Sequence, residues 1–126
     1  MDGFTPGRGP ILLEAELSGP ATIMVARLIL DTGATTTLIK PNILLAVGYD
    51  LDYVAERVPV TTVDGERLAP RLQLNRLSAL GRHRFGFSVV CFPLPTSDGI
   101  HGLLGLDFFQ GTVLTIDFRV GRIDLS

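Results

Sequence analysis

The tripeptide Asp31-Thr32-Gly33 brings together residue types that acid–base chemistry uses. It follows residues 26–30, in which four of five residues are apolar. A carboxylate at the end of a buried strand is costly unless it is hydrogen-bonded or neutralised. Thr32 adds a hydroxyl donor, and Gly33 allows its backbone to approach another group closely. The tripeptide therefore predicts an acid, a donor and an exposed amide at one tight strand end. A structural Asx-turn is the alternative interpretation, because all three residue types are common in turns.

A second segment, residues 102–109, reads Gly-Leu-Leu-Gly-Leu-Asp-Phe-Phe and begins 71 residues after Asp31 (102 minus 31). Two apolar residues, a glycine and a short apolar helical stretch predict a strand that turns sharply at the glycine. Such a strand would form the floor of a site without carrying chemistry itself. The predicted floor residues are Leu103, Leu104 and Gly105.

The dipeptide Asp64-Gly65 lies between two β-prone segments, residues 58–63 and 66–68. An Asp-Gly dipeptide between strands is a strong signal for a two-residue hairpin turn, in which both turn positions need a positive φ. The sequence therefore predicts a β-hairpin with Asp64 and Gly65 as its turn.

Short segments of high β-propensity recur along the rest of the chain. About seven to nine such strands, with turn signals about every eight to twelve residues and little helix, favour an all-β barrel or sandwich. Pro41 and Gly48 delimit the one predicted helix, over residues 41–47. The strands expected outside the hairpin are residues 11–17, 21–30, 35–39, 71–80, 85–92, 113–117 and 122–125.

The sequence predicts a flexible N-terminal arm over residues 1–10, which contain three glycines and two prolines. Residues 11–126 contain no linker, repeat or low-complexity segment, so they are expected to form a single domain.

Composition excludes several classes of protein. The chain has 126 residues, of which 46% are hydrophobic and 19% charged, and this composition excludes intrinsic disorder. A net charge of −2 gives no electrostatic reason to bind nucleic acid. The single cysteine excludes an internal disulfide framework and a multi-cysteine zinc site, and the presence of two histidines argues against a histidine-rich metal site. No apolar run reaches the roughly 20 residues of a membrane helix. The polar, turn-rich N-terminus does not resemble a secretory signal, so we expect a cytoplasmic protein.

Three segments together resemble one known family, the retropepsin-like aspartic proteases. Residues 28–35, 63–65 and 103–107 are similar, in order and spacing, to the motifs of its single-domain bacterial and cellular members. The resemblance implies a small closed acid-protease barrel with one or two short helices. It also implies a homodimer, because this chain has one Asp-Thr-Gly and the family needs one aspartate from each of two copies.

The resemblance implies an aspartic endopeptidase that hydrolyses an extended peptide or protein substrate without a cofactor or metal. Two carboxylates about 3 Å apart cannot both ionise, so the pair shares one proton. The ionised carboxylate takes a proton from water, and the protonated one donates to the scissile carbonyl oxygen. Apolar walls, Ile29, Val63, Leu68 and Ile100 among them, predict a preference for hydrophobic residues around the cut.

The resemblance also assigns a role to each matching residue. Asp31 is the catalytic residue, and the hydroxyl of Thr32 would bond across the dimer. The site scaffold comprises Thr32, Gly33, Ala34 and Thr35, and the flap that binds substrate comprises Thr62, Val63, Asp64 and Gly65. Two positions depart from common patterns. Thr35 stands where Ser or Asp is more frequent, and Asp107 stands where retroviral members carry Arg or Asn and cellular members often carry Asp.

Two other functions stay open at this point. One is a catalytically silent retropepsin-like module for dimerisation or peptide binding, and the other is an unrelated ligand-binding barrel. The remaining chemically active side chains have structural interpretations. His83 and His101 are expected on surface turns or loops, Cys91 in the core and Asp107 as a helix cap.

Overall fold

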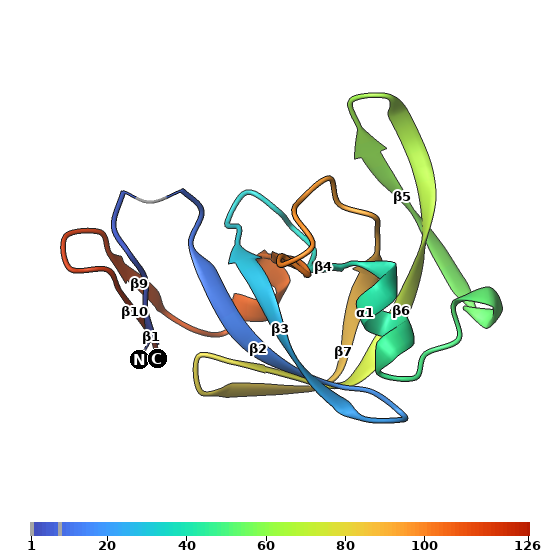
Figure 1. Cartoon of the computed structure of the whole chain (residues 1–126), viewed down its shortest axis with the longest axis horizontal. Helices are drawn as coiled ribbons and strands as arrows, with labels where there is room; N and C mark the ends of the chain where they lie inside the picture. The colour runs from blue at the N-terminus through green and yellow to red at the C-terminus, as the bar shows by residue number, and fades with distance from the viewer. Residues whose placement is uncertain (1, 8) are drawn as a thin grey trace.

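The computed structural model describes residues 2–7 and 9–126 (Figure 1). Six of its strands pair in a closed ring. The order around the ring is β2 (Leu12–Ser18), β3 (Ile23–Leu30), β8 (Gly102–Leu104), β4 (Leu38–Ile39), β7 (Arg82–Cys91) and β6 (Gly65–Ala79). The pairing of β2 with β6, from Glu16↔Ser78 to Ser18↔Arg76, completes the ring. The predicted all-β closed barrel is therefore confirmed.

Alternation of side chains explains why the barrel strands form. In β2, Leu13, Ala15 and Leu17 are buried, whereas Glu14 and Glu16 point to solvent. Each fully buried leucine stabilises the fold by about 2 kcal/mol, so this pattern fixes which face of each strand turns inward. The same core includes Leu28 and Leu104 of the adjacent parallel strands and the aromatic ring of Phe108, as part of one continuous cluster.

The helices are short, as expected. The only α-helix in the described part of the chain is α1 (Pro41–Ala46), which begins at the predicted proline. The helix is followed by Val47 and by Gly48, which has a φ of 105°. A Cβ at Gly48 would lie 2.7 Å from the Cβ of Ala21. The described residues also form two 3₁₀ helices, η1 (Leu51–Tyr53) and η2 (Leu106–Phe109).

The β5–β6 hairpin extends beyond the ring (Figure 1). It pairs β5 (Glu56–Thr62) with the first half of β6. Thr62 lies opposite Gly65, so the turn residues are Val63 and Asp64, and the prediction of Asp64-Gly65 as the turn is wrong by one residue. Of these residues only Gly65 has a positive φ, 112°. A turn with negative φ followed by a glycine at positive φ is another common way to connect two antiparallel strands.

The two strands expected at residues 66–68 and 71–80 are one 15-residue strand, β6. It passes through Pro70, where β6 has a partner only on the β5 side, because its pairing with β7 begins at Arg71↔Val90. A residue without an N–H is tolerated at such an edge. The turn expected at residues 81–84 lies at Leu80 and Gly81, which have φ values of 53° and 74°.

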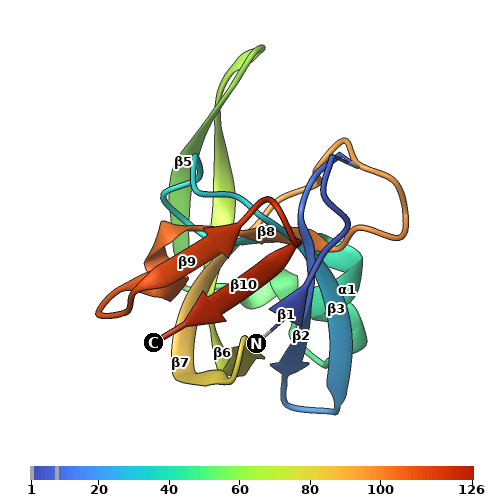
Figure 2. The ribbon, with the colours of Figure 1, turned by 90° about the vertical axis from the view of Figure 1, so that its left-hand side faces the viewer.

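A second, three-stranded sheet brings the two ends of the chain together (Figure 2). It has the order β1 (Asp2–Gly3), β10 (Arg122–Leu125) and β9 (Leu114–Asp117). The arm predicted over residues 1–10 therefore contains one short strand. Phe4 packs edge-on against Phe118, with 5.9 Å between the centroids of the two rings. Residues 1 and 8 lie outside the described residues, and the flexibility of the arm stays a prediction.

Candidate active site

Asp31 follows directly after the buried end of β3. Its backbone N–H donates to the carbonyl of Leu104 at 3.0 Å, which joins the end of β3 to the end of the parallel strand β8. Its carboxylate oxygen Oδ1 accepts a 3.0 Å hydrogen bond from the N–H of Gly33. The side chain is partly exposed, so the carboxylate is held by its own loop and stays open to solvent.

The other residues of the Asp31 loop lie at the surface. Thr32, Gly33 and Thr35 are exposed and Ala34 is partly exposed. The Ala34 N–H donates to the carbonyl of Asp31 at 3.1 Å, which closes the turn. Within the described residues, the Thr35 hydroxyl makes no hydrogen bond to Asp31. The expected neighbours of Asp31 are therefore brought together on one tight loop.

The predicted floor residues lie immediately beside this loop. Leu104 is fully buried, and the next residue, Gly105, approaches the loop backbone so closely that a Cβ there would lie 2.8 Å from the carbonyl oxygen of Ala34. Only glycine fits this approach without a backbone shift. The N–H of Leu106 donates to the same Ala34 carbonyl at 2.8 Å, so the floor and the Asp31 loop form one unit.

Thr37 is a site-supporting residue that the sequence analysis missed. It is completely buried, and its hydroxyl donates to Asp107 at 2.7 Å and accepts from the N–H of Gly105 at 3.1 Å. The prediction that Asp107 caps a helix is wrong, because Gly105 occupies the cap position of η2 and the Asp107 carboxylate binds Thr37 instead. A threonine within a run of β-formers carries no local signal for such a role.

The predicted flap residues, Thr62, Val63, Asp64 and Gly65, lie at the tip of the β5–β6 hairpin. Thr62 and Gly65 bond each other at the hairpin tip, and Val63 is fully exposed. Among the described residues, no hydrogen bond joins this tip to Asp31 or to the floor strand. Its supporting strand β5 nevertheless borders the same cleft as the Asp31 loop.

That cleft, of about 1000 Å³, lies between the Asp31 loop, β5 and β7. It is continuous from Gly33 to the inner side of the hairpin. Its lining comprises residues 33–36, Leu38, residues 58–61, Arg71, residues 83–88, Val90 and Asp107. A cleft of this volume is within the range of ligand-binding clefts in proteins.

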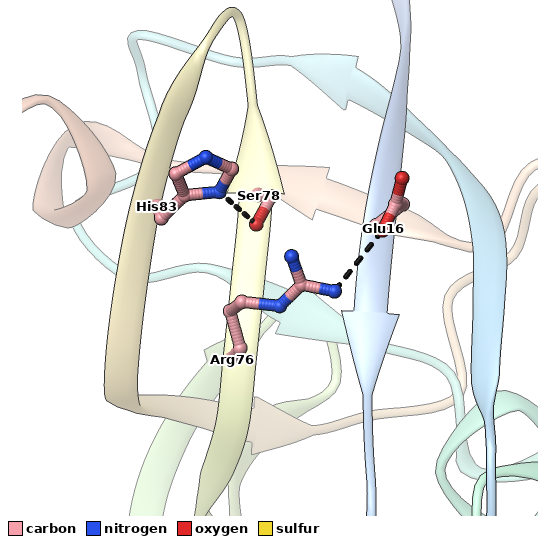
Figure 3. Close-up of polar contacts among 4 residues, drawn as sticks. All are labelled: Glu16, Arg76, Ser78 and His83. Carbon is pink, nitrogen blue, oxygen red and sulfur yellow. Dashed lines mark hydrogen bonds and ion pairs between the residues drawn. The ribbon is translucent and has the colours of Figure 1, made fainter.

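The remaining candidate residues have structural contacts. Nδ1 of His101 accepts a 3.0 Å hydrogen bond from the N–H of Arg27. Burial lowers the pKa of His101, and the charges of Lys40 and Arg27 lower it further. His83 lies on β7 rather than in a turn and is 2.7 Å from the Ser78 hydroxyl; the Glu16–Arg76 ion pair is close by (Figure 3).

Cys91 is buried, and burial raises the pKa of its thiol, as expected of a core residue. Within the described ranges, no three His, Cys, Asp or Glu side chains converge as metal ligands. In the same ranges, each helix is too short or too polar to cross a membrane.

Comparison with known proteins agrees with this geometry. The solved structure of a retropepsin-like aspartic protease from Rickettsia conorii superposes with a TM-score of 0.66. The two chains are 19% identical, and the match covers 93% of this chain and 81% of the other, which establishes a shared fold. No curated protein matches the sequence. The family model for aspartyl proteases matches residues 13–108, which include both the Asp31 loop and the floor strand, and the chain therefore belongs to the aspartyl protease family.

Proposed function

We propose that the protein is an aspartic endopeptidase whose active site forms when two copies each contribute Asp31. The observation that carries this proposal is the position of Asp31. It follows a buried strand, accepts a hydrogen bond from Gly33 and stands on the loop whose next residues, 33–36, line a cleft of about 1000 Å³. Membership of the aspartyl protease family supports the same chemistry.

Two Asp31 carboxylates that meet across a two-fold axis share one proton, because two neighbouring negative charges are unfavourable. The ionised member removes a proton from a water molecule, which attacks the scissile carbonyl carbon. The protonated member donates to the carbonyl oxygen. The N–H of Gly33 holds one oxygen of the Asp31 carboxylate in place on the loop.

The scaffold residues hold this pair in place. Thr32 is exposed beside Asp31, where its hydroxyl can bond the partner copy of the loop. The contact between Ala34 and Leu106 fixes the loop on the floor formed by Leu103, Leu104 and Gly105. Thr35 lies at the cleft wall. A fixed geometry matters because a catalytic carboxylate must be aligned with water and carbonyl before the reaction begins.

The substrate is an extended peptide, held by main-chain hydrogen bonds and by pockets for alternate side chains. The hairpin tip, Thr62 to Gly65, acts as the flap that closes over the substrate and excludes water. Its exposed position and short turn are consistent with a segment that moves toward Asp31 when a peptide binds.

The test is cleavage of a mixed peptide library between acid and neutral pH by the wild type and by Asp31→Asn, each at equal high concentration. Cuts made by the wild type and lost in the variant support the proposal. A dimeric protein that binds peptides but cuts none would instead identify a silent peptide-binding module. Equal cutting by both proteins would contradict a catalytic role for Asp31.

A further inference from the structure

Where the β5–β6 hairpin borders the cleft, apolar residues lie next to the positively charged Arg71. Residues directly opposite each other on paired strands share a face of the sheet. Leu38 on β4 lies opposite Val90 on β7, and Val90 lies opposite Arg71 on β6. All three residues line the cleft, so Arg71 lies next to the apolar residues Leu38 and Val90 on one face of the sheet.

The apolar part is a distinct small cluster beneath the hairpin. Val90, Ala69 and Phe92 are buried in it, and Leu38, Val58 and Val60 pack against them while remaining partly exposed. Partly exposed aliphatic side chains at the wall of a cleft favour contact with an apolar side chain of a ligand.

Arg71 retains hydrogen-bonding capacity. Its one ion pair among the described residues, with Glu56 on β5, has a single N–O distance of 3.4 Å, and the two side chains are 46% and 58% exposed. An ion pair of this kind is weak and is readily exchanged for a better partner. The guanidinium group has five N–H donors and binds a carboxylate in a bidentate arrangement.

The other charged groups that line the cleft are already engaged. Arg84 donates to the carbonyl oxygens of Phe108 at 2.8 and 3.1 Å and of Gln110 at 2.6 Å. Asp107 accepts both hydrogen bonds from Thr37. Arg71 is therefore the charged side chain of the cleft lining best able to bind a ligand.

We propose that Arg71 is a specificity-determining residue that selects extended peptides carrying an acidic side chain near an apolar one. The apolar side chain lies on Leu38, Val58, Val60 and Val90, and the acidic side chain displaces Glu56 from Arg71. The identification of the peptide as a substrate rests on the proposed function, whereas the binding preference itself does not.

The test measures binding of labelled peptide pairs by fluorescence anisotropy, on an Asp31→Asn background that keeps the peptides intact. In each pair one position of an apolar peptide carries Glu or Gln, and this position is moved along the series. We expect one position at which Glu binds about threefold to tenfold more tightly than Gln. Arg71→Glu should abolish or reverse that preference, and Glu56→Gln should increase it by freeing Arg71.

Arg119→Glu is the matched control, because it makes the same charge change at an exposed turn outside the cleft lining. It should leave the preference intact, and Arg71→Gln provides a second variant should Arg71→Glu fail to fold. Equal binding of Glu and Gln peptides at every position, absence of peptide binding, or a preference unchanged in Arg71→Glu would overturn the inference. If the preference depends on Arg71 but the wild type cuts none of these peptides, the inference stands and the proposed protease function fails.

Discussion

The Asp107 carboxylate accepts two hydrogen bonds from Thr37, one from its hydroxyl at 2.7 Å and one from its backbone N–H at 3.0 Å. These residues are 70 positions apart in the sequence. Their contact joins the segment that follows the Asp31 loop to the helical turn that follows the floor strand. Because the Thr37 hydroxyl also accepts from Gly105, this one side chain holds together the segments on which the proposed chemistry depends.

Replacement of Thr37 by Val should destabilise the fold strongly, although the two side chains have similar shapes. The variant leaves the Gly105 N–H without its buried partner and removes one bond to Asp107. We expect a loss of about 2–3 kcal/mol in the free energy of unfolding. Denaturation by urea measures this loss, with an unchanged dependence on denaturant concentration.

Thr115→Val, on the exposed face of β9, is the corresponding control and should change stability by less than about 0.5 kcal/mol. Similar small effects for both variants would show that the Thr37 hydroxyl contributes little to stability.

The parts of the fold that depend on local sequence were predictable. The alternating pattern of β2 and the proline and glycine around α1 are each set within a few residues, and the structure follows them closely. The close approach of Gly105 to Ala34 agrees with a strand that turns sharply at that glycine. These features need no knowledge of distant contacts.

The parts that depend on distant contacts were not predictable. Leu80 has a φ of 53°, which a leucine rarely adopts, yet it occupies a two-residue turn with Gly81 and its side chain is buried in the core. Burial compensates for this backbone conformation, and no local pattern reveals it. Asp64-Gly65 has the better turn sequence, but pairing between Thr62 and Gly65 shifts the turn by one residue.

Tyr49→Phe should lower the stability of the barrel, because the Tyr49 hydroxyl binds backbone groups of β2 and β6. The Tyr49 hydroxyl accepts from the N–H of Asn75 at 2.9 Å and donates to the carbonyl of Ser18 at 3.3 Å. The Asn75 N–H lies at a gap in the pairing of β6 with β7, which passes from Leu74↔Phe87 to Arg76↔Phe85. Gly86, at the same gap on β7, has a φ of 59°. We expect a loss of about 1 kcal/mol in urea denaturation. Tyr53→Phe, at a side chain that is almost fully exposed, should have no measurable effect.

Tyr49 should also make the fold sensitive to alkaline pH. Burial raises the pKa of Tyr49 above its usual value, and the hydrogen bond from Asn75 opposes this only in part. The unfolded chain therefore loses the phenolic proton first as the pH rises. The stabilisation is complete below the ordinary tyrosine pKa and is lost as the pH rises through the pKa of the folded protein. A steeper alkaline loss in Tyr49→Phe than in the wild type would contradict this assignment.

His101 should contribute to a loss of stability on acidification. Nδ1 of His101 accepts a hydrogen bond from the backbone N–H of Arg27, and only a neutral imidazole ring can accept at this atom. Burial is the main cause that lowers the pKa of His101. The unfolded state binds the proton more readily, so this contribution is complete above the ordinary histidine pKa. It is lost as the pH falls through the lower pKa of the folded protein.

Denaturation midpoints measured between pH 8 and pH 5 test this prediction (about one unit or more on either side of the ordinary histidine pKa). His101→Asn places an acceptor oxygen near the Nδ1 position without a titrating ring, and it should reduce the pH dependence. Equal pH profiles for the wild type and His101→Asn would exclude the role of His101.

Mixing experiments should reveal whether two copies share one active site. If each site needs Asp31 from both subunits, an inactive Asp31→Asn subunit inactivates every wild-type subunit with which it pairs. With the wild type held constant and subunits exchanging freely, an equal amount of variant should reduce cleavage to about one half, and a ninefold excess to about one tenth. Substrate is kept well above the protein concentration, so that binding by inactive dimers does not deplete it. Unchanged cleavage, with subunit exchange verified by mass, would show that a single chain carries the complete site.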